Sequence, residues 1–160
     1  MYWASENLPG YYQFGATTQA TGTAWETTPY YVSGNENDGV VFSKYNTVGL
    51  TLDASDDAAA VAGKGRIPSV AEWDELRTSC TWTWNGSGFT VSRNGVSIIL
   101  PAANSYGTSY GRGYYWANEV GKTHNFDAHY LYFGNNEQPS SVSDKWGQRY
   151  NAYCIRPVHD

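Results

Sequence analysis

The segment 81–101 constrains the fold more than any other part of the chain. Residues 81–84 read Thr-Trp-Thr-Trp, so both indole rings lie on one face of an extended strand. Apolar side chains alternate in the same way over 89–91 and over 96–100. The Asn-Gly dipeptide at 94–95 separates these two runs and is favoured in tight hairpin turns. The segment therefore predicts antiparallel strands that are joined by a hairpin turn.

Two helices are expected before this hairpin. Acidic residues at 56–57 precede a run of small apolar residues at 58–62, and negative charge at a helix start is favourable. The second helix begins with Ser-Val-Ala-Glu at 69–72, which is a capping box. Trp73 and Leu76 then fall on one face of this helix.

Strands are expected to dominate the rest of the chain. Residues 128–133 and 152–158 read as strands, and 40–42 reads as a short buried strand or a loop anchor. The segment 15–39 is rich in Gly, Thr and Asn and is interpreted as a long ordered loop. Helices followed by mostly antiparallel strands predict a single α+β domain that spans residues 1–160.

The charge balance excludes several kinds of partner. The chain has a net charge of −5, and its 10 Lys and Arg residues form no stripe. Nucleic-acid binding needs a basic surface that releases counterions, so no nucleic-acid partner is expected. A polybasic membrane patch is absent for the same reason, and no apolar run approaches the ~20 residues of a membrane span. No membrane insertion is therefore expected.

Residues that could carry catalysis or bind a metal have simpler explanations. The carboxylate clusters at 53–57 and 72–75 lie at expected helix starts, where capping accounts for them. A His-Asp-His set within 124–129 could ligate a metal, but polar residues in a loop and on the open face of a strand need none. The oxygen-rich stretch 35–38 matches no hand-shaped calcium loop and is interpreted as a solvated turn. We therefore expect no enzyme activity, no cofactor and no metal.

The two cysteines, Cys80 and Cys154, leave their chemical state open. They could form one disulfide that closes a long loop, or they could be two buried thiols, which is the interpretation we favour. The chain has no Cys-x-x-Cys pair, so a four-ligand metal site is not expected.

The C-terminal third combines aromatic and small polar residues. This mixture suits a recognition surface, because Tyr gives rigid amphipathic contact area at little entropy cost while Ser and Asn adapt their hydrogen bonds. The alternative is that the tyrosines are ordinary strand residues and that Asn and Ser fill loops. The residues expected to contact a ligand are Asn118, Glu119, His124, Asn125, Asp127, His129, Tyr130, Tyr132, Tyr150, Asn151 and Tyr153.

Eight short motifs occur in an order that resembles the major paralogous domain family (FISUMP), found in gut Bacteroidetes and their phages. The resemblance covers most of the chain and implies a fold related to C-type lectins and to the formylglycine-generating enzyme, with the termini close together. Asn104 departs from the pattern, since a glycine is usual there, and Ala117-Asn118 replaces a pair of serines. The motifs are Trp3-Ala4 with Asn7-Leu8 and Gly15-Ala16, Leu52-Asp53 with Asp57-Ala58-Ala59, Arg66-Ile67-Pro68-Ser69 with Glu72-Trp73 and Leu76, then 80–84, 98–103, 113–117, 128–133 and 149–158.

Departures from the family pattern concentrate in the last forty residues. In this respect the chain is similar to the variable proteins of diversity-generating retroelements, in which adenine-directed mutagenesis rewrites Asn codons near the C-terminus. The resemblance implies that 115–158 is a variable binding region. It further implies a receptor-binding tip of a phage fibre or a cell-surface adhesin, located on a virion, on a bacterial surface or outside the cell. The implied partner is a host-cell surface protein or glycan, and a homo-oligomer such as a trimer is possible in a fibre.

Two alternatives stay open. The chain could be an invariant secreted glycan-binding module, in which Trp116 and Trp146 stack on sugar. It could instead be a degenerate enzyme of the formylglycine-generating type or a structural tail domain. Such enzymes use a close pair of redox cysteines, whereas Cys80 and Cys154 occupy positions that look structural or variable within the family.

The expected helices and strands, together with the family resemblance, predict which residues form the interior. Arg149 and Arg156 are expected to anchor polar networks beneath the binding face. The predicted core consists of Trp3, Trp73, Leu76, Trp82, Trp84, Ile98, Leu100, Trp116, Leu131, Phe133 and Ile155.

Overall fold

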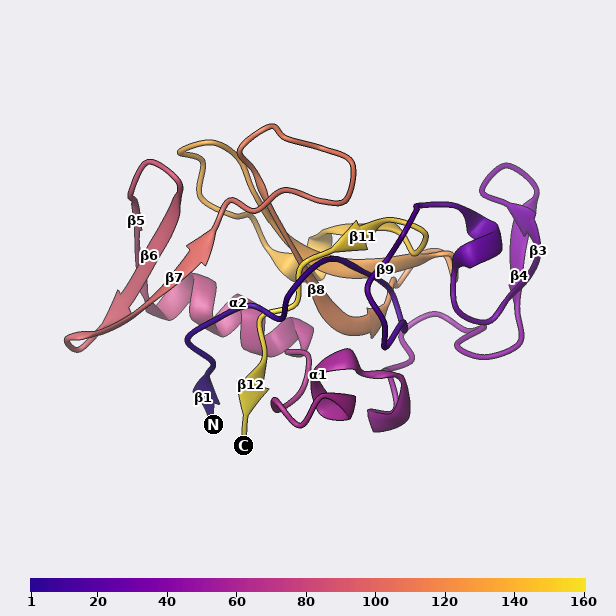
Figure 1. The fold of residues 1–160 in the computed structure, drawn as a ribbon, viewed down its shortest axis with the longest axis horizontal. Coiled ribbons are helices and arrows are strands. Elements are labelled where there is room, and N and C mark those ends of the chain that lie inside the picture. The colour runs from indigo at the N-terminus through magenta and orange to yellow at the C-terminus, as the bar shows by residue number, and fades with distance from the viewer.

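Short antiparallel strands carry most of the regular structure in the computed structural model, which describes residues 1–160 (Figure 1). The helices are α1 (Ala58–Val61) and α2 (Val70–Ser79), with 3-10 turns η1 (Trp25–Thr27), η2 (Ala54–Asp56) and η3 (Val142–Asp144). The strands are β1 (Tyr2–Trp3), β2 (Tyr12–Gln13), β3 (Tyr31–Asn35), β4 (Gly39–Phe42), β5 (Thr81–Trp84), β6 (Gly88–Arg93), β7 (Val96–Pro101), β8 (Gly113–Val120), β9 (Asp127–Phe133), β10 (Trp146–Gln148), β11 (Ala152–Tyr153) and β12 (Val158–His159).

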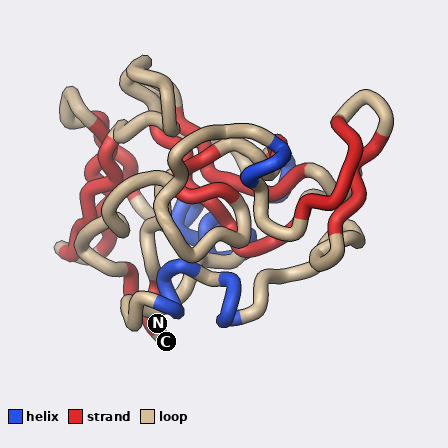
Figure 2. The backbone as a smooth tube through the Cα atoms, turned by 45° about the vertical axis from the view of Figure 1, so that its right-hand side comes forward, coloured by secondary structure: helices blue, strands red, loops and turns tan.

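The strands pair into five small sheets with the orders β1-β12, β10-β9-β8, β11-β2, β3-β4 and β5-β6-β7, and every pair is antiparallel. Loops and turns connect these sheets and trace much of the molecule (Figure 2). The α+β class predicted from the sequence is confirmed. None of the helices is both long enough and apolar enough to cross a membrane.

The sheet β5-β6-β7 has the hairpin arrangement that its alternation predicts. Trp82 lies opposite Val91 and Phe89 lies opposite Leu100, and all four side chains are buried on one face. Residues 94–95 have φ angles of 53° and 79°, which a type I′ turn requires.

Carboxylate and hydroxyl groups cap both helices. The Asp57 carboxylate accepts hydrogen bonds from the backbone N–H groups of Ala59 and Ala60, at 2.9 and 3.1 Å. The Ser69 hydroxyl accepts from the backbone N–H of Glu72, and the Glu72 carboxylate accepts from that of Ser69, at 3.1 and 2.8 Å. The predicted capping box is therefore confirmed, and it fixes where α2 begins.

The β8-β9 pair runs through the middle of the molecule (Figure 1). It separates two apolar cores. The core on one side joins α2 to the β5-β6-β7 sheet, and the core on the other side includes Phe14, Trp116 and Ile155. Most of the predicted core residues are buried. Trp3, Trp84 and Ile98 are only half-buried, but they pack against the first of these cores.

The segment 15–39 is not one long loop, as the sequence suggested. It contains β3, which turns back into β4 to make a second hairpin. The Asn35 side-chain oxygen accepts from the backbone N–H groups of Asn37 and Asp38, at 2.9 and 3.1 Å. This Asx turn reverses the chain, and glycines on both sides supply positive φ angles. The prediction failed because β3 carries little apolar alternation.

The expected strand 152–158 is also divided. Its first part, β11, pairs with β2, and its last part, β12, pairs with β1. Between these parts the backbone of Cys154 pairs with β8, so the chain changes partners directly after β11. The pairing of β1 with β12 brings the termini together, as the family resemblance implied (Figure 1).

Arg156 is a buried guanidinium that joins three remote segments. Its Nε donates to the Asn7 side-chain oxygen at 2.8 Å, and its Nη1 and Nη2 donate to the carbonyls of Ala4 and Ile99, at 3.2 and 2.6 Å. These bonds hold the N-terminal segment and β7 against the end of the chain. The predicted polar network of Arg156 is therefore confirmed.

The substitution Arg156→Lys is expected to lower the free energy of unfolding by about 2 kcal/mol or more, because one ammonium cannot replace a fork of fixed donors and buried carbonyls lose their partners. Urea denaturation measures this value. Arg93→Lys is the matched control, since Arg93 is exposed and makes no ion pair, and it should change stability by less than about 0.5 kcal/mol. Equal stabilities for the two variants would contradict the role assigned to Arg156.

Candidate functional site

Four tyrosine rings gather on one face of the β8-β9 pair. Tyr130 and Tyr132 share this face because they are two residues apart on β9, and Tyr132 lies opposite Tyr114 of β8. Tyr153 of β11 completes the group, which we call the tyrosine cluster. The ring centroid of Tyr114 lies 5.2 Å from that of Tyr132 and 5.1 Å from that of Tyr153, and Tyr130 and Tyr153 are 4.7 Å apart.

The tyrosine cluster has a buried layer and an exposed layer. Tyr130 and Tyr153 are 9% and 5% exposed, whereas Tyr114 and Tyr132 are half-buried. Burial raises the pKa of Tyr130 to about 12 and also raises that of Tyr153. Both phenols therefore stay protonated at neutral pH. The half-buried rings rest on an uncharged and closely packed base, which limits their motion.

Two cations flank the tyrosine cluster. The Lys145 ammonium lies 4.8 Å from the Tyr132 ring centroid and 5.8 Å from that of Tyr130, within the range of cation–π attraction. The Tyr114 hydroxyl raises the pKa of Arg112, and the nearby Tyr132 contributes to the same shift. Neither cation forms an ion pair with a carboxylate.

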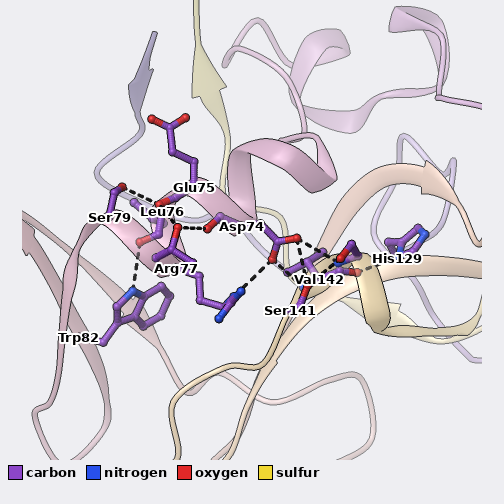
Figure 3. Close-up of polar contacts among 11 residues, drawn as sticks. Asp74, Glu75, Leu76, Arg77, Ser79, Trp82, His129, Ser141 and Val142 are labelled. Carbon is purple, nitrogen blue, oxygen red and sulfur yellow. Dashed lines mark hydrogen bonds and ion pairs between the residues drawn. The ribbon is translucent and has the colours of Figure 1, made fainter.

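Asp74 of α2 positions the segment that carries Lys145. Figure 3 shows its carboxylate directed at η3, where it accepts from the backbone N–H groups of Val142 and Ser143 at 2.7 and 3.1 Å. The Ser141 hydroxyl donates to the same carboxylate at 3.3 Å. Asp74 thus links the helix beneath the sheet to the chain that leads into β10.

His129 holds the same segment from the opposite side, and it does not point outward as expected. The side chain is 4% exposed, and its Nδ1 lies 2.8 Å from the carbonyl oxygen of Val142 and 3.0 Å from that of Lys145 (Figure 3). His129 alternates with Tyr130 along β9, so it lies on the opposite face of the strand, together with the buried residues Leu131 and Phe133. His129 can affect a ligand only by positioning Lys145.

Asp127 is likewise buried, with 5% of its surface exposed, and does not face outward. Burial raises the pKa of its carboxyl, and His124 lowers it through an Nδ1 that lies 3.5 Å away. His124 is exposed and stacks on Phe126 with a centroid distance of 4.7 Å. The chain contains no group of three or more His, Cys, Asp or Glu side chains placed to hold a metal ion.

A third, smaller core consists of Trp25, Val40 and Phe42, and Asn125 and Tyr150 contact it. The Asn125 side-chain amide donates to the carbonyls of Val40 and Asn46, each at 3.2 Å, and lines a shallow groove against the β3-β4 hairpin. Tyr150 packs edge-on against Trp25 with a centroid distance of 4.9 Å. Both side chains, and that of Asn151, are half-buried.

Asn118 and Glu119 belong to another part of the molecule. The Asn118 backbone pairs with Leu52 and Pro68, and the Glu119 carboxylate accepts from the backbone N–H of Val70 at 3.4 Å. These contacts fasten β8 to the start of α2. Of the eleven predicted residues, the structure therefore brings Tyr130, Tyr132 and Tyr153 together in the tyrosine cluster. His124, Asn125 and Asp127 form a separate group at the turn into β9, and the others lie elsewhere.

A network around Asp56 accounts for one of the carboxylate clusters. Its carboxylate accepts from the hydroxyls of Tyr30 and Tyr45, each at 2.6 Å, and from the Lys44 ammonium at 2.7 Å. Burial raises the pKa of Asp56, but these hydrogen bonds outweigh it and the pKa lies below its ordinary value. The sequence suggested that Asp56 caps the helix. The structure shows instead that its carboxylate links the segment 30–45 to the turn before α1.

The sequence reasoning missed Tyr114, Arg112 and Lys145. Tyr114 was missed because it precedes the expected variable region by one residue. Strand alternation could have separated it from Tyr115, since neighbouring side chains point to opposite faces of a strand. Nothing in the local sequence marks Lys145, because its position depends on Asp74 and His129, which are remote along the chain.

Comparison with known proteins gives no further guide to this site. Searches against protein-family models, curated proteins and solved structures find no match to the chain. The geometry of the site itself is that of an aromatic surface with two cations beside it, in which Asp74 and His129 hold the segment that carries Lys145.

The substitution Asp74→Ala is expected to loosen η3, because three donors lose a charged acceptor. The free energy of unfolding should fall by about 2 kcal/mol, and the amides of Val142 and Ser143 should exchange with solvent faster. Urea denaturation and hydrogen exchange measure these effects. Glu75→Ala is the control, since Glu75 is the exposed neighbour on the same helix. Unchanged exchange at Val142 in Asp74→Ala would refute the anchoring role.

The buried tyrosines also predict a loss of stability in alkali. The unfolded chain releases the Tyr130 proton near pH ~10, whereas the folded protein holds it to about 12, so the unfolded state gains relative stability between these values. The free energy of unfolding should be insensitive to this group below pH ~10 and fall above it. Tyr130→Phe should reduce the slope by up to ~1.4 kcal/mol per pH unit, whereas Tyr110→Phe, at an exposed position, serves as the control. An identical slope in Tyr130→Phe would argue against the burial of this hydroxyl.

Proposed function

We propose that this chain is a binding domain that recognises a molecule on a cell surface through the tyrosine cluster and the loops beside it. The observation that carries the proposal is the pair of half-buried rings, Tyr114 and Tyr132, held on a packed layer of two further tyrosines. Preorganised aromatic side chains lose little entropy on binding, and Tyr is enriched among residues that dominate binding energy.

Loops next to the cluster add adaptable polar groups. The segment 104–112 reads Asn-Ser-Tyr-Gly-Thr-Ser-Tyr-Gly-Arg, a composition that suits recognition surfaces, and both of its tyrosines are exposed. It lies beside the loop 134–141 at one end of the β8-β9 pair (Figure 1). The two loops touch where the Gly111 backbone approaches Asn135. Together they extend the tyrosine cluster into a broader surface.

The finer fold is part of this proposal. A C-type-lectin-like arrangement is supported by the paired termini, the helix α2 beneath the central sheet, and the long irregular stretches between short strands. In such an arrangement a rigid scaffold carries a surface whose side chains can change without altering the fold. Within 115–158, we propose that diversification acts on the exposed and half-buried residues and spares interior ones such as His129.

The role of a receptor-binding tip or adhesin can be tested in the coding DNA. A nearby near-copy of the segment that encodes 115–158, differing only at adenines, is expected if a diversity-generating retroelement acts on it. Differences should fall on codons for residues such as Tyr132 and His124 and not on those for Leu131 or Phe133.

Stacking of Trp116 on a sugar, which the glycan-module alternative required, is ruled out by its position. The ring is 1% exposed, and its Nε1 donates to the Tyr12 carbonyl at 2.6 Å. A redox-enzyme alternative receives little support from Cys154, since burial raises the pKa of this thiol to about 12 and a thiolate is the reactive form. Both cysteines are free.

Binding to intact cells tests the proposal. The domain is displayed on fluorescent streptavidin tetramers, because multivalency makes weak single-site binding visible, and is applied to a panel of gut bacterial strains. Tyr132→Ala and Tyr114→Ala should each weaken binding by about 30-fold, the effect of losing about 2 kcal/mol at a central aromatic contact. Melting temperatures identify any variant that fails to fold.

The control is Tyr2→Ala, which removes an exposed ring of β1, a strand at the termini and away from the β8-β9 pair (Figure 1). It should bind like the unaltered domain. Full binding by Tyr132→Ala and Tyr114→Ala, or binding lost only in Tyr2→Ala, would place the binding surface elsewhere. Failure of the unaltered domain to bind any strain would also count against the proposal.

A further inference from the structure

The two cations beside the tyrosine cluster are unusual within this chain. Four of its basic residues, Lys44, Arg66, Arg77 and Lys122, form ion pairs with carboxylates. Arg149 and Arg156 are buried and donate to backbone carbonyls or side-chain amides. The remaining basic residues are Lys64, Arg93, Arg112 and Lys145, and the last two lie at the cluster.

Unpaired positive charge here is notable because the chain as a whole carries a net charge of −5. Acidic residues outnumber basic ones, yet no carboxylate pairs with either cation. Glu137 is near enough to Arg112 to influence its pKa, but it forms no ion pair with it. The cluster thus has two cations without carboxylate partners on an acidic protein, and such cations attract anionic ligands.

Lys145 lies against Tyr132, and Arg112 lies against Tyr110 in the loop that leads into Tyr114. The Lys145 ammonium lies 4.8 Å from the centroid of the Tyr132 ring. The Arg112 guanidinium carbon lies 5.5 Å from the centroid of the Tyr110 ring, and Arg112 precedes Tyr114 by two residues. A flat apolar group stacked on Tyr132 would therefore have a positive charge within reach of its edge. A guanidinium offers a fork that matches a carboxylate, and an ammonium offers a compact point charge.

We propose that the tyrosine cluster binds a carboxylate-bearing sugar of the uronic or sialic acid class, whose ring packs against the tilted rings of Tyr132 and Tyr114 and whose carboxylate meets Lys145 and Arg112. This inference rests on the proposed function and names its ligand. The C–H face of a sugar ring is apolar and suits an aromatic face, while its hydroxyls match the polar loops on either side.

The strand pairing favours a sugar over an acidic peptide. A peptide commonly binds a sheet by adding a strand to a free edge. The edge of β8 next to the cluster is already used, because Cys154 donates to the Tyr114 carbonyl at 2.9 Å and accepts from the Trp116 N–H at 3.1 Å. Recognition at this place therefore depends on side chains, and a rigid ring loses less entropy there than an extended peptide.

Matched sugars test the inference by isothermal titration calorimetry. The probes are oligogalacturonate and its fully methyl-esterified form, and a sialylated oligosaccharide and its asialo form. We expect the acidic member of one pair to bind at least about tenfold more tightly than its neutral partner, the effect of one charge-assisted contact. Lys145→Gln and Arg112→Gln should each weaken the acidic ligand by about tenfold and leave the neutral one unchanged.

The controls are Lys64→Gln and Arg93→Gln, which remove the other two unpaired cations and should alter neither affinity. Tyr132→Phe keeps the ring and should retain binding, whereas Tyr132→Ala should lose it. Melting temperatures confirm that each variant folds.

Each other outcome overturns the inference in a recognisable way. Equal affinity for acidic and neutral sugars would reject recognition of the carboxylate. If both affinities were lost in Tyr132→Ala, the proposed binding surface would still be supported. Absence of acidic-sugar binding, or tighter binding of a poly-glutamate peptide, would reject the sugar while cell binding through Tyr132 still supported the proposed function. Cell binding that is insensitive to Tyr132→Ala would reject both.

Discussion

Two buried guanidinium groups hold together a fold that has little regular structure of its own. Arg149 donates to the carbonyls of Tyr45 and Asn125, at 2.7 and 2.9 Å, and its guanidinium carbon lies 3.6 Å from the centroid of the Phe42 ring. Arg156 does the same for the N-terminal segment and β7. Burying a charge is costly. All three nitrogens of Arg156 donate to oxygen atoms, whereas Arg149 uses only its Nη1, leaves its Nε and Nη2 without hydrogen-bond partners, and lies against the face of the Phe42 ring. Separate small sheets are joined in this way where no strand ladder connects them.

The β8-β9 pair at the centre of the fold both fills the cores and carries the tyrosine cluster. The β8-β9 pair fills two cores, yet on one face it presents Tyr114 and Tyr132, while Asp74 and His129 fix the segment that carries Lys145. Polar residues that were expected to contact a ligand, such as His129, instead hold backbone segments in place. The surface that remains is small, aromatic and positively charged, and its shape is set by hydrogen bonds that lie beneath it.

Local signals predicted the parts of the fold that depend on neighbours in sequence. The capping box at Ser69 and the hairpin turn at 94–95 are complete within a few residues, so the sequence alone specifies them. The burial of His129 could not be predicted, because strand alternation does not reveal that both faces of β9 are covered. Lys145 was missed for a related reason, since contacts with α2 and β9 place it at the tyrosines. Sequence therefore located the strand that bears the site, but not which side chains are exposed on it.

The most direct test of the central claim is to see which tyrosine rings a ligand touches. NMR spectra of protein labelled with ¹³C in its 14 tyrosine rings can follow a titration with soluble polysaccharide released from a strain that the domain binds. The account predicts that the ring signals of Tyr114 and Tyr132 shift first, while those of Tyr2 and Tyr31 stay unchanged. Shifts confined to tyrosines outside the cluster, with Tyr132 unaffected, would contradict it.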